Sequence, residues 1–194
     1  RFGKTTADYY ELIRLDPSYK VVFGTDDYID IPAQIEELKA QFDVLEPGSG
    51  ARLDEFLAQA AYKYQVGINK LVYKPGRSLT EFMSPKLLID MIRLDIFQSM
   101  HKHVRKYFSN ARILQLIEFP ILFLGATPQN TPALYSLMNY ADISLGTWYP
   151  KGGMHKIVEG MVSLAEELGV TFKYDQEVSQ ITVTNGRASA VETT

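Results

Sequence analysis

The chain has 194 residues, a formal net charge of -3, 46% hydrophobic and 22% charged residues, a composition ordinary for a globular protein. The negative charge argues against a nucleic-acid partner, because neutralising phosphates requires a basic surface. With no cysteine the chain has neither disulfides nor thiol chemistry, and no apolar run reaches the ~18 residues of a membrane-spanning helix. We therefore expect a cytoplasmic protein.

The first third of the sequence predicts a hairpin followed by two helices. Apolar residues favour strands at Tyr19–Phe23 and Tyr28–Ile31, on either side of a Gly-Thr-Asp-Asp turn. Pro32 suits the first turn of a helix that continues to about Phe42. After a Pro-Gly-Ser-Gly break, apolar residues at helical spacing predict a long helix from about Ala51 to Leu71.

The middle of the sequence predicts shorter helices at Pro85–Ile92, Phe97–Phe108 and Ala111–Glu118. The run Ile113–Leu124 is the most apolar stretch, and two interpretations are open for it. It is a core helix, or it forms the wall of an apolar substrate tunnel or an element that dips into a membrane surface. In the second interpretation the aromatic residues that line the tunnel are Phe119, Phe123, Trp148 and Tyr149.

The last third begins with the sequence Thr-Trp-Tyr-Pro-Lys-Gly-Gly-Met, residues 147–154. Paired glycines before a helix leave backbone N–H groups open to a ligand, where the helix dipole favours negative charge. An apolar stripe predicts that helix from Met154 to Leu168, with Gly169 as its C′ residue. Alternation at 170–174 predicts a strand, and Asn185-Gly186 predicts a type I′ turn between strands at 178–184 and 187–191.

These elements predict an α+β fold in two parts, with a helix-rich region at residues 1–145 and a piece of an α/β layer at 146–194. A metal site is not expected. His101 and His103 are two residues apart, so on a helix they point in different directions, and His155 is the third histidine of a chain without cysteine. No Gly-x-Gly-x-x-Gly, Walker or Gly-x-Ser-x-Gly motif is present in the sequence.

Several stretches together resemble the bacterial carotenoid desaturases, the phytoene desaturase group of the amine-oxidase-like flavoproteins. The resemblance is collinear along essentially the whole chain. The Trp-Tyr-Pro-x-Gly-Gly-Met element is specific to that group, and the Val-x-x-Ile strand is shared by the wider superfamily. The stretches that carry it are Leu15–Lys20, Ser78–Pro85, Thr131–Tyr135, Trp148–Met154, Val178–Ile181 and Asn185–Arg187.

The resemblance implies an FAD-dependent enzyme that removes hydrogens from a long linear polyene such as phytoene. It implies a helix-rich substrate domain joined to part of a Rossmann-like FAD-binding domain, and peripheral contact with the inner face of the membrane. Gly152, Gly153 and Met154 match the cofactor contact, and Val178 matches the strand residue whose backbone faces the adenine. Glu81 matches an acidic residue proposed to handle protons, although relatives carry Asp there and the basic residue that follows is replaced by Ser84.

The amino-terminal glycine-rich loop and the carboxy-terminal flavin segment of that family have no counterpart in this sequence. We therefore expect an internal fragment that by itself neither retains FAD tightly nor turns over. Three alternatives stay open. They are a related desaturase, isomerase or ketolase of the same fold; a non-catalytic module that binds apolar ligands or a membrane surface; and an interaction domain whose glycines are structural.

Overall fold

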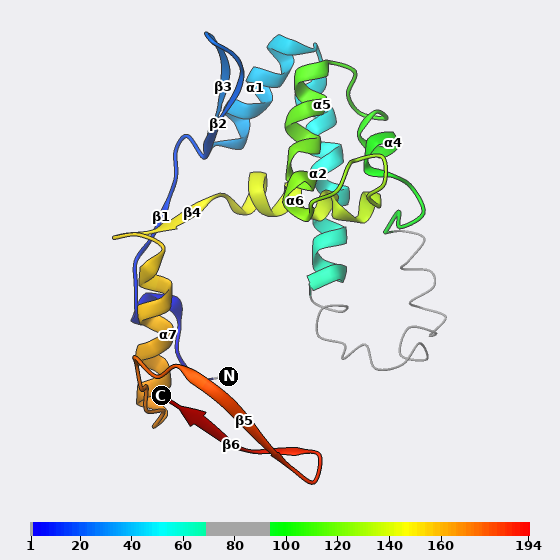
Figure 1. Ribbon diagram of the computed structural model, residues 1–194. Helices are drawn as coiled ribbons and strands as arrows, with labels where there is room; N and C mark the ends of the chain where they lie inside the picture. The colour runs from blue at the N-terminus through cyan, green and yellow to red at the C-terminus, as the bar shows by residue number, and fades with distance from the viewer. Residues whose placement is uncertain (1, 69–93) are drawn as a thin grey trace. The chain divides into compact units, whose positions relative to one another are not determined.

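A computed structural model describes residues 2–68 and 94–194 of the chain (Figure 1). The expected helix at Pro85–Ile92 and the candidate residue Glu81 lie outside these ranges. The chain divides into two compact units, one formed by Ile13–Tyr149 and the other by the residues up to Leu12 together with Pro150–Thr194. The short strands β1 (Leu12–Arg14) and β4 (Trp148–Pro150) span the two places where the chain passes from one unit to the other.

The expected hairpin is confirmed at the start of the larger unit. β2 (Tyr19–Gly24) and β3 (Asp27–Ile31) pair antiparallel with Tyr19 opposite Ile31. The side chains of β2 alternate between half-buried and exposed, so one face of the hairpin packs on the protein. Ile31 at the end of β3 is part of the hydrophobic core.

The first helix begins later than expected. α1 runs over Ile35–Leu45, so Pro32 precedes it and the expected start at Pro32 was wrong. Ala33 explains the difference, because its N–H donates to the Asp16 carboxylate and its carbonyl accepts from the Arg14 guanidinium. These bonds hold the backbone outside the helix. α2 (Ser49–Val66) follows, and the Asp43 carboxylate accepts from the N–H of Gly50 in its first turn.

α5 (Ala111–Glu118) has the expected bounds, and Asn110 caps it by accepting from the N–H of Arg112. The helix expected at Phe97–Phe108 is shorter: α4 covers Met100–Val104. It starts at Met100 because Ser99, in an extended conformation, is its N-cap: the Ser99 hydroxyl accepts from the N–H of Lys102. A 3-10 helix (Phe119–Leu124), a 3-10 helix (Ala133–Ser136), α6 (Leu137–Asn139) and a π-helical turn (Tyr140–Leu145) complete the described part of the unit.

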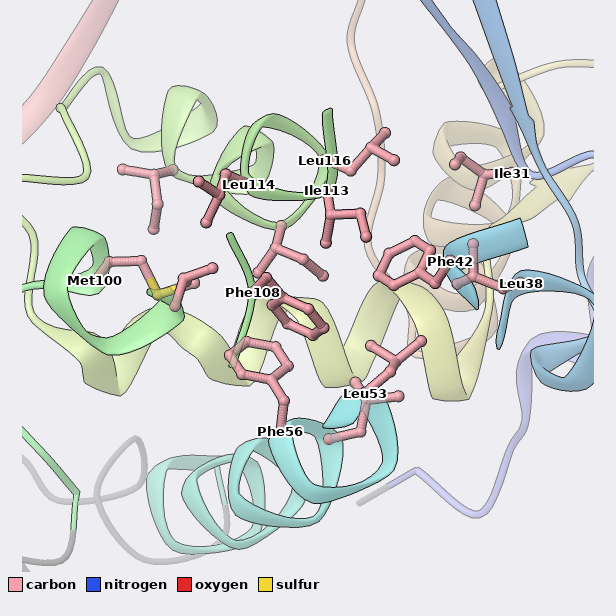
Figure 2. Packing of buried hydrophobic residues seen from close by; sticks show 14 residues of the cluster. Ile31, Leu38, Phe42, Leu53, Phe56, Met100, Phe108, Ile113, Leu114 and Leu116 are labelled. Carbon is pink, nitrogen blue, oxygen red and sulfur yellow. The ribbon is translucent and has the colours of Figure 1, made fainter. Parts of the chain in front are cut away.

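The hydrophobic core of this unit lies between α1, α2, α4 and α5 (Figure 2). Leu53 and Phe56 of α2 face Phe108 and Ile113 in Figure 2. Phe108 also packs edge-on against Phe42, with 5.8 Å between ring centroids. The cluster contains Ile31, Leu38, Phe42, Leu53, Phe56, Leu57, Met100, Val104, Phe108, Ile113, Leu114, Leu116, Ile117 and Ile121.

The apolar run at 113–124 is buried in its first part and exposed in its last part. Its first part is core helix, as Ile113, Leu114, Leu116 and Ile117 are buried. Pro120 and Ile121 are buried as well, whereas the side chains of Leu122, Phe123 and Leu124 are exposed. No helix in 2–68 or 94–194 is long and apolar enough to cross a membrane.

The smaller unit contains a 3-10 turn (Thr6–Asp8), α7 (His155–Glu167), β5 (Val178–Thr184) and β6 (Arg187–Thr193). The expected helix and hairpin are confirmed. Gly169 takes φ +86° after α7, and Asn185 and Gly186 both take positive φ in the turn, as type I′ requires. The strand expected at 170–174 was wrong: these residues pair with no strand among those described, and Phe172 stacks on Tyr174 instead. The chain is thus α+β, with helices and small two-stranded sheets.

Candidate functional site

An apolar cavity of about 920 Å³ lies within the larger unit. β2 forms one side of it, α2 contributes Tyr64 and the following Ile68, and the segments at 119–123 and 137–147 close the remainder. Small-molecule sites typically have this size and a mostly apolar lining. The residues around the cavity are Ser18, Tyr19, Lys20, Val21, Val22, Tyr64, Ile68, Phe119, Pro120, Phe123, Leu137, Met138, Ala141, Asp142, Gly146 and Thr147.

Aromatic rings form much of the cavity wall. The ring of Phe119 lies 5.8 Å from that of Tyr19 and 5.2 Å from that of Phe123, in the second case edge to face. Tyr64 packs against Tyr140 with 5.4 Å between centroids. These contacts fix the orientation of the rings, so the wall presents flat apolar surfaces to a ligand.

One point of the wall is strongly polar. The Tyr19 hydroxyl donates to Oδ2 of Asp142 at 2.6 Å, and the Thr147 hydroxyl donates to Oδ1 at 3.1 Å. Burial, followed by the hydrogen bond to Asp142, raises the pKa of Tyr19 far above its ordinary value. The Tyr19 hydroxyl therefore keeps its proton and remains a donor to the carboxylate. Sequence reasoning did not find this pair, because its members are 123 positions apart.

The four residues expected to line a tunnel fall into two groups. Phe119 and Phe123 line the cavity. Trp148 and Tyr149 are outside the set of residues around it, and both are about half exposed. The Trp148 indole N–H donates to the carbonyl of Leu145, which holds the ring at the surface of the unit.

The glycine pair occupies a tight turn in the smaller unit. Gly152 and Gly153 take φ values of +88° and +104°, where a side chain would be strained. The Gly153 N–H donates to the Pro150 carbonyl, so the turn itself uses it. Within residues 2–68 and 94–194 the Gly152 N–H donates to no backbone carbonyl. One of the two expected open N–H groups therefore remains.

The other expected cofactor residues lie in the same unit. Met154 is the N-cap of α7 and is exposed, and Val178 is the first residue of β5 and is exposed as well. An open N–H, a turn that a Cβ would strain and exposed backbone at a helix start together fit a group with phosphates or polar ring edges. Among residues 2–68 and 94–194, no three His, Asp or Glu side chains are grouped so as to hold a metal ion.

Sequence reasoning also missed a buried polar cluster around Lys63 of α2. The Lys63 ammonium contacts the Asp95 carboxylate at 2.9 Å and Nε2 of His103 at 3.2 Å. It also donates to the Ala133 carbonyl and the Ser136 hydroxyl, both at 3.2 Å. The sequence did contain a signal that Lys63 is buried. It lies seven residues after Phe56 and three after Ala60, which places it on the apolar stripe of the helix.

A family model described as flavin containing amine oxidoreductase matches residues 10–194. The chain belongs to this family. The match includes the cavity segments, the glycine turn and the β5–β6 hairpin.

Curated relatives are carotenoid enzymes, as the resemblance implied. The chain is 38% identical over 93% of its length to a carotenoid 3,4-desaturase of Haloarcula japonica. It is 31% identical over 97% of its length to a zeta-carotene-forming phytoene desaturase of Myxococcus xanthus. A 4,4'-diapophytoene desaturase of Staphylococcus aureus is 29% identical over 93% of the chain. The chain spans 37% of the length of the first two relatives and 36% of the third.

Proposed function

We propose that the chain is part of an FAD-dependent desaturase that removes hydrogens from a long, linear carotenoid precursor of the phytoene type. The observation that carries this is the aromatic-walled cavity of about 920 Å³ in a chain of a flavin-containing oxidoreductase family. A hydrocarbon offers almost no polar handles, so its binding energy comes from burial against apolar walls. FAD would accept hydride from the substrate, while the protein holds the substrate carbons in place.

The two units take different parts in this proposal. The unit Ile13–Tyr149 binds the polyene, with Phe119 and Phe123 as channel residues. The unit that contains Pro150–Thr194 belongs to a Rossmann-like FAD-binding domain. There the Gly152 N–H and the backbone of Gly153, Met154 and Val178 would hold the cofactor.

A flavin measurement on the full-length protein tests the role of the turn. Gly152→Ala should lower the ratio of bound FAD to protein several-fold. Gly169→Ala is the matched control, because Gly169 has nearly the same φ, +86° against +88°, and lies at the other end of α7. Equal flavin loss in both variants would show that strain at α7, and not a cofactor contact, is responsible.

Product analysis tests the reaction. Carotenoid-producing cells that carry the full gene should convert the colourless precursor into a polyene with more conjugated double bonds. A Phe119→Asp variant, with a charge in the cavity wall, should abolish conversion while the protein still binds FAD. Products with a shifted double bond or an added oxygen would identify an isomerase or ketolase, and unchanged precursor would favour a non-catalytic binding module.

We further propose that the enzyme is cytoplasmic and contacts the inner face of the membrane peripherally. The supporting observation is the exposed apolar turn Leu122–Leu124, in which Leu122 is 64% and Phe123 72% exposed. Phe123 also lines the cavity, so an apolar substrate could enter from lipid next to it. Flotation with vesicles should recover less Leu122→Ser than wild-type protein, whereas Val44→Ser, at an even more exposed apolar residue of α1, should float as wild type.

A further inference from the structure

The Asp142 carboxylate is out of place in a cavity that binds only hydrocarbon. It lies in the wall beside Phe119 and Phe123, whose surfaces a polyene would contact. Within 2–68 and 94–194 no cation lies within ion-pair distance of Asp142, and its partners are the hydroxyls of Tyr19 and Thr147. Covering such a group with a hydrocarbon removes water without replacing its hydrogen bonds, which costs free energy.

The carboxylate has acceptor capacity to spare. A carboxylate offers about four lone-pair sites. Tyr19 uses one at Oδ2 and Thr147 uses one at Oδ1, so each oxygen can accept a further hydrogen bond. Because the pKa of Tyr19 is raised, its hydroxyl continues to donate and does not compete as an acceptor for the same proton.

A purely structural role would be a clasp between β2, which carries Tyr19, and the segment 140–147, which carries Asp142 and Thr147. A clasp needs only the two hydrogen bonds already made, and it does not need the carboxylate to line the cavity. A carboxylate in the wall of an apolar site instead discriminates among ligands, favouring one that donates a hydrogen bond and rejecting one that carries negative charge.

We propose that Asp142 is the polar recognition point of this cavity and that its ligand is a long apolar polyene with a hydroxyl group, which donates to the carboxylate. This inference rests on the proposed function of the cavity as the polyene site. It narrows the substrate from a plain hydrocarbon to a polyene that carries a hydroxyl group, and it names the residue that selects this group. Phe119 and Phe123 would hold the apolar part of the same molecule.

Three polyenes that differ in their terminal group test the proposal on the full-length protein. Retinol carries a hydroxyl, retinoic acid a carboxylate and axerophtene only hydrocarbon, and each is measured by displacement of a fluorescent polyene ester. Wild-type protein should bind retinol about tenfold or more tighter than axerophtene, as expected for a hydrogen bond to a charged group. Retinoic acid should bind most weakly.

Variants separate recognition from a clasp. Asp142→Leu should bring the three affinities to within about threefold of one another, since no polar contact remains. Asp142→Asn should lose the rejection of retinoic acid while keeping part of the preference for retinol. Tyr19→Phe should keep the preference, because the carboxylate remains. Asp26→Asn, at an exposed turn carboxylate, should behave as wild type.

The outcomes are distinct. Equal binding of retinol and axerophtene by wild-type protein would overturn the role of Asp142 and leave the cavity as a polyene site. Weaker binding of all three ligands by Asp142→Leu, with unchanged ratios, would show a clasp and overturn recognition in the same way. If the protein binds neither the ester nor any of the three ligands, the cavity does not bind polyenes, and the proposed function of this unit fails together with the inference.

Discussion

The ammonium of Lys63 lies 2.9 Å from the Asp95 carboxylate, although the Lys63 side chain is only 1% exposed and that of Asp95 is 28% exposed. Burial lowers the pKa of Lys63, and the hydrogen bond to Asp95 opposes that shift. The cluster joins α2 to α4 and to the 3-10 helix Ala133–Ser136, which directly precedes the cavity-lining segment 137–147 in the chain. Removing these contacts should therefore lower the stability of the larger unit.

Removing the partner of the buried lysine should cost more than removing the lysine. Asp95→Asn should destabilise the protein by roughly 2 kcal/mol, because it leaves a buried ammonium without its counter-charge. Asn suits this position, as Asp95 has φ +53° and Asn tolerates the left-handed region. Lys63→Met should cost less, since the Asp95 carboxylate is partly solvated and Ser136 already bonds Ala133. Urea denaturation, followed by the fluorescence of Trp148, measures the stability of both variants. A larger loss in Lys63→Met than in Asp95→Asn would contradict the role of Asp95 as the counter-charge of Lys63.

His103 should make stability depend on pH. Burial, aided by the nearby Lys63 charge, lowers the pKa of His103 from 6.5 to about 4, while Asp95 acts in the opposite direction and Lys106 adds to the lowering. The unfolded chain then binds a proton at higher pH than the folded chain. The free energy of unfolding should therefore fall by up to about 3 kcal/mol as the pH drops from about 6.5 to about 4. Below pH 4 His103 is protonated in both states, so it causes no further loss.

Urea denaturation at a series of pH values measures this dependence. His103→Gln should flatten the curve over that interval. His155→Gln, at an exposed histidine of α7, should leave the curve as in wild type. An unchanged slope in His103→Gln would mean that another group is responsible.

Local signals in the sequence were enough for much of the fold. Asn185-Gly186 predicted the β5–β6 hairpin, apolar spacing predicted α5, and an apolar stripe with Gly169 as the C′ residue predicted α7. The helix start predicted at Pro32 was wrong because hydrogen bonds to Arg14 and Asp16 hold Ala33 outside the helix. Sequence spacing does not reveal these contacts. The strand expected at 170–174 failed because alternation alone does not provide a pairing partner.

The candidate site was less predictable than the fold. Phe119 and Phe123 could be named because they belong to an obviously apolar run. The Tyr19–Asp142 pair and the Lys63 cluster depend on contacts between residues far apart in sequence, which no local pattern contains. The glycine turn was recognisable from its motif, yet the sequence did not show that the Pro150 carbonyl accepts a hydrogen bond from the Gly153 N–H.

Phe56 should be one of the residues on which the core depends most. Its fully buried ring packs edge-on against Tyr107 at 5.5 Å and Phe108 at 6.1 Å. Phe56→Ala should lower the free energy of unfolding by roughly 3–5 kcal/mol, because a cavity remains in the cluster. Phe97→Ala, at a ring that is 85% exposed, should change it by less than about 0.5 kcal/mol. Similar losses in both variants would contradict the core described by the structure.

Gly50 should resist substitution because α1 and α2 approach closely there. A Cβ at Gly50 would lie 2.7 Å from the Asp43 carboxylate and 3.0 Å from the Lys39 carbonyl, so Gly50→Ala should cost roughly 1–3 kcal/mol. Asp43→Ala should cost about 1 kcal/mol, because it removes the cap on the Gly50 N–H. The double variant should cost less than the sum of the two, since without the carboxylate only the Lys39 carbonyl opposes the methyl group. Additive costs in urea denaturation would show that the two residues do not share this contact.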